Sequence, residues 1–465
     1  MTRILLPLVL VVVAHPAFAR LRAGAAAADI SPQEFPIRVI GNFGVTLAKS
    51  VHDPLHARAV VLEDGMKIAI VLVDSCFVKR EEMDRAKALA SKQTGIPMNR
   101  ILISATHTHS APPSKAEVGN QIEERYVERL VSQTASAIVQ ANARLAPARI
   151  GWEVVPVPDE VFNRRWFMRE GGIVADPFGA TTDKARMNPP PGSKDLVHPA
   201  GGTDPGFSIV SIQSADGKPL ALLGNYSLHY VGGVPGPEVS ADYFGEFSRQ
   251  VGQSLAAGDP SFVAMLTNGT SGDVNNNDFV HPRPRAEPYA RIGVVAGKLA
   301  RHAAEAAGRI QYTESAPVKI AERELRLRFR RPTPEQLSFA KMALEANDES
   351  KLPRNAKAYA QRALSLNSGP EFADLKLQGI RIGGLGIATI PCEVFTEIGI
   401  TIKELSPFRP TFTIELANGH YGYLPTPRHF ALGGYETWLG TNNLEREASV
   451  KITRTLLELL GQVEK

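Results

Sequence analysis

The chain has 465 residues, more than the roughly 250–300 at which one hydrophobic core usually stops growing, so one large domain or two smaller ones are possible. Hydrophobic residues make up 43% of the chain and charged residues 22%, an ordinary globular composition that argues against a disordered chain or a membrane protein. The net charge is only +4 and Lys and Arg form no long runs, so the composition does not have the pattern of a nucleic-acid-binding protein.

The first 19 residues have the layout of a secretory signal peptide. Arg3 precedes an apolar run over residues 4–14, and the segment ends in the small-x-small pattern Ala17-Phe18-Ala19. We therefore expect cleavage after Ala19, a mature domain over residues 20–465, and a secreted or periplasmic protein. An uncleaved anchor is the less favoured alternative, because the apolar run is shorter than the roughly 20 residues that a spanning helix needs. No other segment of the sequence predicts a transmembrane helix.

Strand-like and helix-like segments then alternate through most of the chain. The first part predicts a β-hairpin over residues 57–65 and 67–78, followed by a helix over residues 81–95. A short strand over residues 99–109 and a long amphipathic helix over residues 124–145 come next. The rest predicts two helices over residues 245–257 and 290–308, and a broken helical pair over residues 333–366. Two strand regions, over residues 374–394 and 412–418, and a last helix from about residue 449 follow. This order predicts an α/β fold in which a large mixed β-sheet is layered with α-helices.

Two loops rich in Pro, Gly or Asn interrupt the pattern, over residues 176–206 and 275–288. Loops of this length in a compact domain usually act as lids or mobile segments. Because neither a domain boundary nor an internal repeat is evident, we predict a single catalytic domain. The two cysteines, Cys76 and Cys392, lie in apolar strand-like runs, and two buried free thiols are favoured over a disulfide between them, since a large core needs no covalent staple.

The sequence SATHTHSAP places His107 and His109 one residue apart at the end of a predicted strand. Residues i and i+2 of a strand face the same way, so both imidazoles can point into one site. Histidine is the commonest metal ligand but has other uses, so half of a metal site and two ordinary polar residues are equally good interpretations of this pair alone.

Further polar residues follow other apolar strands. His229 ends the strand of GNYSLHYVGG, Asp242 precedes a helix, Glu393 stands between a strand and a helix, and a turn-rich loop carries His420, Tyr421, Tyr423 and His429. Each has a structural explanation: a buried hydrogen-bonded histidine, helix N-terminal acids and packed tyrosines. Their common position at strand ends favours a shared site.

Five motifs in this order resemble the neutral ceramidase family, the neutral/alkaline non-lysosomal ceramidases: ATHTHSAPP, NYSLHYVGG, NGTSGDVNNN, IPCEVFTEIG and NGHYGYLPT. The resemblance extends from about Ala23 to Gly440. It implies one Zn²⁺ held by His107, His229, Glu393 and Tyr423, with Tyr421 as the alternative for the last ligand. It also implies that His109 lies beside the metal and that Asn163 and Arg164 line the pocket.

Two features depart from the family pattern. A serine that the family carries after its Gly-Asp-Val segment falls here at Asn275, with Thr270 and Ser271 nearby but out of register. We therefore expect zinc-activated water to act as the nucleophile, with Asn275 as a hydrogen-bonding group and Asp242 as a further site residue. The sequence also ends soon after the last motif, so we expect the family's C-terminal β-domain to be absent.

These observations predict a zinc-dependent amidohydrolase that cleaves a small-molecule amide or lipid, either N-acylsphingosine or a related amide, without nucleic acid as a partner. Zinc activates water and polarises a carbonyl, and an adjacent imidazole such as His109 moves protons. Arg164 is suited to bind an anionic oxygen. Two alternatives stay open: a zinc hydrolase of the same fold that acts on a different amide or ester, and a secreted binding protein that has lost catalysis.

Overall fold

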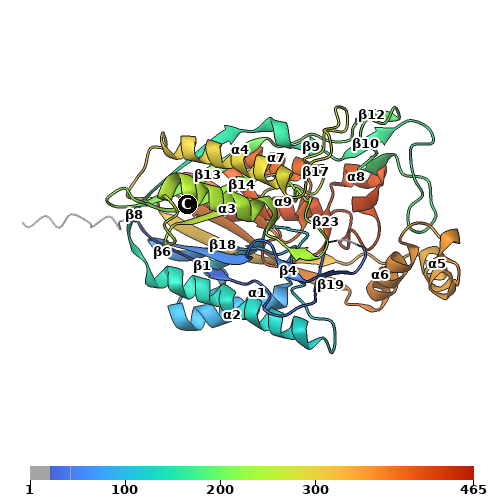
Figure 1. Cartoon of the computed structure of the whole chain (residues 1–465), viewed down its shortest axis with the longest axis horizontal. Coiled ribbons are helices and arrows are strands. Elements are labelled where there is room, and N and C mark those ends of the chain that lie inside the picture. The colour runs from blue at the N-terminus through green and yellow to red at the C-terminus, as the bar shows by residue number, and fades with distance from the viewer. Residues whose placement is uncertain (1–20, 42) are drawn as a thin grey trace, which may run out of the picture.

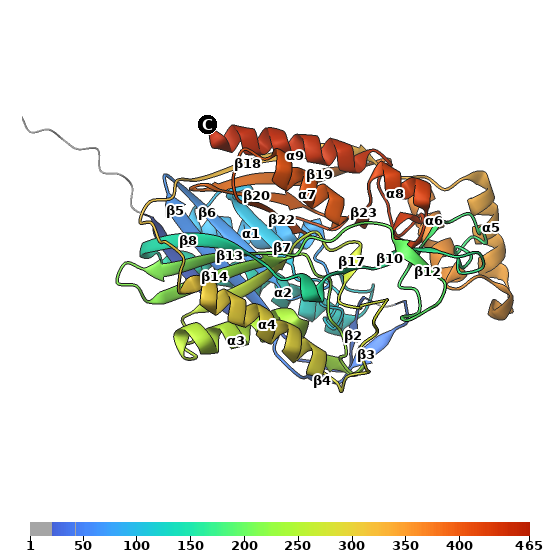
Figure 2. The same cartoon turned by 90° about the horizontal axis from the view of Figure 1, so that it is seen from above.

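Two β-sheets pack face to face at the centre of the molecule, and helices cover the outer face of each (Figure 1 and Figure 2). The structure, a computed structural model, describes residues 21–41 and 43–465. The predicted signal peptide and its cleavage site lie outside the described residues. Among the described residues, no helix has both the length and the apolar character that crossing a bilayer requires.

The larger sheet has eight strands and is mixed, as the sequence predicts. Two neighbouring pairs, β14 with β16 and β6 with β7, are parallel, and the other neighbours are antiparallel. In spatial order its strands are β16 (Val263–Asn268), β14 (Pro219–Tyr226), β13 (Gly206–Ser214), β8 (Ala146–Pro156), β1 (Arg22–Asp29), β5 (His56–Asp64), β6 (Met66–Val73) and β7 (Ile101–Ala105).

The smaller sheet has four strands: β18 (Val318–Arg328), β19 (Phe372–Ile382), β20 (Leu385–Ile390) and β22 (Thr411–Glu415). Its last pair, β20 with β22, is parallel. Apolar side chains of both sheets fill the space between them, among them Val60 and Ile70 from the larger sheet and Ile387 and Phe412 from the smaller one. The sequence predicts strand regions that cover β19, β20 and β22, but not that they form a separate sheet.

Helices pack on the opposite faces because strand side chains alternate between the two sides of a sheet. In β5, Val60 points into the space between the sheets whereas Val61 packs against the helices. The larger sheet is covered by α1 (Arg80–Thr94), α2 (Gln121–Ala143), α3 (Asp242–Ala256) and α4 (Ala290–Ala307), and the smaller sheet by α7 (Thr396–Leu405) and α9 (Ala448–Glu464). The fold class predicted from the sequence is confirmed.

A helical hairpin projects at one end of the molecule (Figure 1). It consists of α5 (Pro334–Glu345) and α6 (Ala356–Ser368), which confirms the predicted broken pair. The predicted loop 176–206 is more structured than expected, because β11 (Ala185–Met187) and β12 (Leu196–Pro199) pair with β10 (Arg165–Met168). Cys76 and Cys392 are buried free thiols, as predicted.

The remaining short elements lie mostly around the ends of the two sheets. They are β2 (Ile37–Val39), β3 (Thr46–Ala48), β4 (Ser50–Val51), β9 (Phe162–Asn163), β15 (Glu238–Val239), β17 (Val274–Asn275), β21 (Glu393–Val394), β23 (Tyr423–Leu424) and α8 (Pro427–Leu432). The parallel pairs matter most for function, because the carboxyl ends of parallel strands meet at one edge, where open α/β sheets bind ligands. An isolated bridge between Ser104 of β7 and Ala417, which follows β22, also joins the two sheets, so both sheets send loops to the same place.

A buried lysine links helix α1 to the loop after β22. Lys87 is fully buried, and its ammonium donates a hydrogen bond of 2.6 Å to Oδ1 of Asn418. Asn418 in turn donates to Gln378 of β19, at 3.0 Å. Burial lowers the pKa of Lys87 to about 8, because a charged amine is costly to remove from water.

This shift predicts a pH-dependent contribution to stability. Between about pH 8 and pH 10.5 the unfolded chain binds a proton at Lys87 that the folded chain has lost, so the free energy of unfolding rises with pH in that window. We expect the difference in unfolding free energy, wild type minus Lys87→Met, to increase by about 3 kcal/mol from pH 8 to pH 10.5. Urea unfolding at several pH values measures it. A flat difference would contradict the buried, depressed amine.

Candidate metal centre

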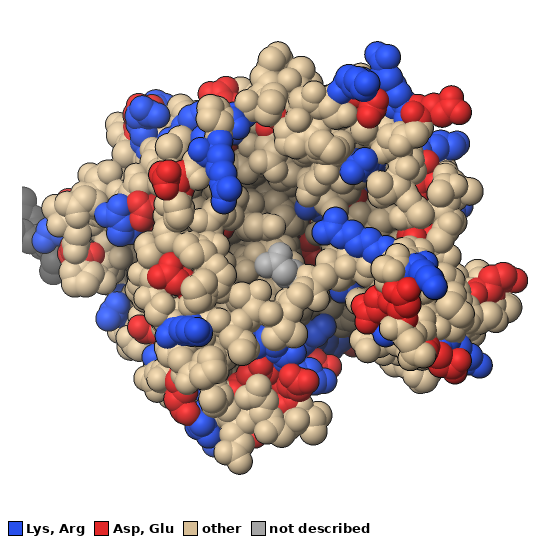
Figure 3. Space-filling view, turned by 45° about the vertical axis from the view of Figure 1, so that its right-hand side comes forward, with Lys and Arg blue, Asp and Glu red and all other residues tan. Residues whose placement is uncertain are grey.

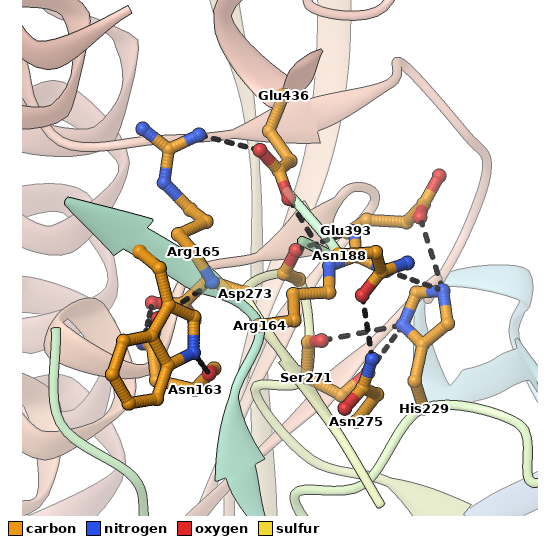
Figure 4. A network of polar contacts seen from close by, with 12 residues as sticks. Asn163, Arg164, Arg165, Asn188, His229, Ser271, Asp273, Asn275, Glu393 and Glu436 are labelled. Carbon is orange, nitrogen blue, oxygen red and sulfur yellow. Dashed lines mark hydrogen bonds and ion pairs between the residues drawn. The ribbon is translucent and has the colours of Figure 1, made fainter. Parts of the chain in front are cut away.

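Two histidines and a glutamate converge where the loops from both sheets meet. Figure 4 shows two of these residues, His229 and Glu393, among their polar neighbours. Nε2 of His107 lies 3.0 Å from Nε2 of His229 and 3.2 Å from Oε2 of Glu393. Nε2 of His229 lies 4.0 Å from the same carboxylate oxygen. All three residues are buried. His229 and Glu393 lie 122 and 286 residues after His107 along the chain, so only the tertiary fold brings the three residues together.

Backbone carbonyls fix both imidazole rings of this cluster. Nδ1 of His107 donates to the carbonyl of Cys76 at 2.8 Å, and Nδ1 of His229 donates to the carbonyl of Ser271 at 3.2 Å. Because each neutral ring carries one proton, these bonds leave both Nε2 atoms with a lone pair that points into the cluster. Oε2 of Glu393 has no hydrogen-bond partner among the described residues.

This donor set fits a divalent cation. Two imidazole nitrogens and a carboxylate oxygen are ligands that zinc takes, and three protein ligands leave an open position in catalytic sites. The electrostatics agree with this assignment. Burial opposes a positive charge on His107, but the Glu393 carboxylate outweighs it and holds the pKa of His107 well above its usual value, so without a cation Nε2 also binds a proton. A divalent cation at the same point would displace that proton and use the Nε2 lone pair. The same local field favours a bound cation.

A second group of possible ligands overlaps the first, namely Cys76, His107 and His109. It uses the opposite side of the His107 ring, because the sulfur of Cys76 lies 3.7 Å from Nδ1. That nitrogen already donates its proton to the Cys76 carbonyl. The set with His229 and Glu393 therefore needs no rearrangement of the ring, and it is the better candidate.

His107 occupies an unusual backbone conformation. Strand β7 ends at Ala105, and His107 has φ 76°, in the left-handed region that non-glycine residues rarely adopt. Convergence of the two imidazoles therefore comes from this turn and not from strand alternation. The rings of His107 and His109 meet edge to face at 4.7 Å, with Nε2 atoms 3.2 Å apart. Such strain, held by the surrounding fold, is typical of functional sites.

His109 lies beside the three-residue cluster. Its ring stacks on Tyr230 at 3.7 Å, and its Nδ1 has no hydrogen-bond partner among the described residues. Gly41, at φ 123°, approaches so closely that a Cβ there would lie 2.5 Å from the His109 ring. Burial, and then the charge of His107, lower the pKa of His109 well below its usual value. The ring is therefore neutral.

The register of two short strands places a tyrosine next to the glutamate. In the parallel pair β21 and β23, Glu393 lies opposite Tyr423. The other tyrosine of this loop, Tyr421, points away, with its hydroxyl 3.3 Å from the carbonyl of Asp374. Of the two sequence candidates, Tyr423 is the one that lines the cavities beside the cluster.

His420 is a residue to which the sequence argument gave no role. Its Nε2 lies 3.2 Å from Oε1 of Glu393, and its ring stacks on Phe77 with centroids 4.2 Å apart. His420 thus holds the carboxylate oxygen that does not face His107. Its position in the loop that carries Tyr421 and Tyr423 indicated that His420 lies near the site. Nothing in the sequence around it indicated that its partner is Glu393.

Arg164 lies between strands β9 and β10 and lines the cavity beside His229. Its guanidinium donates to Glu436 at 3.0 Å and to the carbonyl of Gly272 at 2.9 Å, and it lies 5.3 Å from the centre of the Tyr423 ring. Its Nη1 is 3.4 Å from Nε2 of His229. Glu436, which the sequence argument missed, is fully buried and also pairs with Arg165.

The structure does not bring every predicted residue to the cavity. The side-chain amide of Asn163 donates hydrogen bonds to Asp273 and to the carbonyl of Gly202. Of the expected Asn-Arg pair, only Arg164 therefore lines the cavity. The Asp242 carboxylate accepts from the backbone N–H groups of Val231 and Gly232, at 2.9 and 2.8 Å. It shapes the turn after His229 and does not line the large or the small cavity described below.

Asn275 reaches the cavity only through a neighbour, because its Nδ2 donates to Oδ1 of Asn188 at 2.7 Å. The nearby hydroxyl of Ser271 is not a substitute for the family serine. It donates to Glu415 at 2.6 Å and lies 3.4 Å from Nδ1 of His229, on the side of the ring that faces away from the cluster. Neither side chain therefore offers a nucleophile beside the candidate ligands.

Two adjoining cavities open onto the cluster. The large cavity, of about 790 Å³, touches His229 and Arg164, and the small cavity, of about 380 Å³, touches His107 and Glu393. They share a wall made of Gly41, Phe43, His109, Tyr423 and Tyr435. A substrate bond held at this wall would have one arm in each cavity.

Comparison with solved structures identifies the fold. The chain is similar to the neutral ceramidase of Pseudomonas aeruginosa, with a TM-score of 0.72 and 18% identity over 96% of this chain and 74% of the other. It is also similar to a structure described as ceramidase complexed with C2, with a TM-score of 0.71 and 17% identity over 96% and 75% of the two chains. No protein-family model matches the sequence. The chain therefore has the neutral ceramidase fold, as its motifs predict.

Proposed function

We propose that this chain is a zinc-dependent hydrolase of the neutral ceramidase family that cleaves an amide bond, in N-acylsphingosine or a related amide. The observation that carries the proposal is the convergence of His107, His229 and Glu393, with two lone pairs and one unpartnered carboxylate oxygen aimed at one point. The fold that this chain shares with a neutral ceramidase supports the proposal. We also propose that residues 20–465 form one catalytic domain that is exported after removal of the signal peptide.

Zinc held by His107, His229, Glu393 and Tyr423 would supply Lewis-acid activation of water and of the substrate carbonyl. The side chains of the protein do the remaining work. His109 faces the candidate ligands through its Nε2, which lies 3.2 Å from Nε2 of His107, and this imidazole would move the proton from the attacking water to the leaving amine. Burial raises the pKa of Tyr423 well above its usual value, so its phenol stays protonated unless a cation binds it.

Arg164 positions an anionic oxygen in this scheme. Burial alone would lower the pKa of its guanidinium, but nearby Tyr423 and Glu436 reverse the effect, so the side chain stays charged. A charged guanidinium in a desolvated cavity stabilises negative charge that develops on a substrate oxygen. Water as the nucleophile agrees with the placement of Ser271, whose hydroxyl faces Glu415.

Removal of the metal tests this function. We expect the mature chain, treated with a chelator, to stop hydrolysing a fluorogenic short-chain ceramide and to recover when one equivalent of Zn²⁺ is returned. Far-UV circular dichroism of the stripped protein controls for unfolding. Unchanged turnover after chelation would exclude the metal mechanism. Zinc-dependent turnover of other amides or esters, but not of ceramide, would keep the hydrolase and replace the substrate.

A further inference from the structure

The small cavity carries positive charge that the proposed chemistry does not use. Lys79 and Arg362 line it, together with the imidazole of His420, and Glu393 is the only carboxylate among the described residues that line it. Both oxygens of that carboxylate are turned toward histidines: Oε1 lies 3.2 Å from Nε2 of His420, and Oε2 lies 3.2 Å from Nε2 of His107. No described carboxylate lies within ion-pair distance of either Lys79 or Arg362.

Aromatic rings, not acids, hold the two cations. The ammonium of Lys79 lies 5.0 Å from the centre of the Phe77 ring, and the guanidinium of Arg362 lies 5.1 Å from Phe43. Arg362 also donates to the carbonyl of Gly440 at 3.3 Å. Cation–π contacts of this kind orient a charge but do not neutralise it. Three N–H groups on Lys79 and most of those on Arg362 are therefore available to an acceptor inside the cavity.

The environment of Lys79 disfavours its charge in the absence of a counter-ion. Burial lowers the pKa of Lys79, and the carboxylates of Glu81 and Glu82 do not reverse the shift. A cation retained in such a place needs a partner, because a desolvated charge without one is costly. An anion in the small cavity would supply that partner.

The large cavity offers a different environment. Apolar and aromatic residues line much of it, among them Ile173, Val174, Met187, Tyr435 and Trp438, and its charged residues are Arg164, Arg186, Arg354 and Asp183. Figure 3 shows one face of the molecule with a hollow near its centre and with Lys and Arg side chains on both sides of the hollow. Positive charge around a cleft attracts an anionic ligand and raises its rate of association.

From this contrast we infer that the small cavity is an oxyanion subsite, in which Lys79 and Arg362 bind a carboxylate on the short arm of the substrate. The inference rests on the proposed function, and it names the substrate class: an N-acyl amino acid, with its apolar acyl chain in the large cavity. A neutral sphingoid amide would leave both cations without a partner. The arm that ends in the carboxylate is the amine portion, which hydrolysis releases as a free amino acid.

Binding to the metal-stripped protein tests the subsite separately from catalysis. We expect calorimetry to show that wild-type protein binds N-dodecanoylglycine about ten-fold or more tightly than N-dodecanoylglycinamide, which lacks only the charge. Lys79→Gln and Arg362→Gln should each abolish most of this preference, and Arg362→Lys should retain part of it. Thermal melting confirms that each variant is folded.

Matched controls remove the same charge elsewhere. Lys115→Gln changes an exposed lysine near Lys79, and Arg285→Gln changes an exposed arginine on a separate surface, so both should keep the preference. Equal binding of the two ligands by wild type, or equal losses in the controls, would overturn the subsite. Hydrolysis by the zinc-loaded enzyme is measured separately: selective binding without any amide cleavage contradicts the proposed function only, and cleavage without selectivity contradicts the subsite only.

Discussion

Replacing His107 with alanine is expected to abolish binding of one divalent cation and to lower amide hydrolysis about a thousand-fold or more. His107 is the centre of the cluster, because its Nε2 lies within 3.2 Å of both His229 and Glu393. Loss of one of three buried ligands leaves too few donors for a tetrahedral site. A metal ion contributes several kcal/mol of transition-state stabilisation, and about 4 kcal/mol corresponds to a thousand-fold in rate.

Elemental analysis after gel filtration measures the metal, and a ligand-dependent shift in melting temperature measures its binding in solution. His281→Ala is the matched control, because that side chain is 85% exposed and lies outside the cluster. One equivalent of zinc retained by His107→Ala would contradict the assigned ligand set. The alternative of a secreted binding protein without catalysis predicts no activity in wild type and little change in ligand affinity in the variant.

The sequence could predict the strand ends but not the geometry that joins them. Short apolar runs before His107, His229 and Glu393 indicated three strands, and polar residues after strands indicated a site. Their convergence depends on the parallel pairing of β20 with β22 and of β14 with β16, which a local pattern does not encode. The left-handed turn at His107 was equally hidden, since the residue type disfavours it.

Residues that support the site were harder to predict than residues that form it. Glu436 is an acid in a loop of unremarkable composition, and only the structure shows that it joins Arg164 to Arg165. Asn163 carried the right motif, but its side chain turns toward Asp273. Tertiary contacts set the direction in which such a side chain points. The same limit explains why the sequence predicted the large mixed sheet but not the second sheet, which β18, β19, β20 and β22 form.

Glu436→Gln is expected to destabilise the protein by about 3–5 kcal/mol, even though the new side chain has nearly the same shape. Glu436 is fully buried and accepts from the guanidiniums of Arg164 and Arg165, which are themselves buried. Removal of the one negative charge leaves two desolvated cations side by side, and their hydration cannot be recovered inside the fold. Chemical denaturation measures the change in unfolding free energy.

The variant should also impair catalysis, because Arg164 loses the contact that holds it above Tyr423 and beside His229. We expect hydrolysis measured well below the melting temperature to fall at least ten-fold, while zinc binding persists through His107, His229 and Glu393. Glu371→Gln is the control: it breaks an exposed ion pair with Arg328, in which more than half of each side chain is accessible, so screening by water should make its effect much smaller. Equal destabilisation by the two substitutions would show that burial of the Arg164–Glu436–Arg165 group does not set its energetic importance.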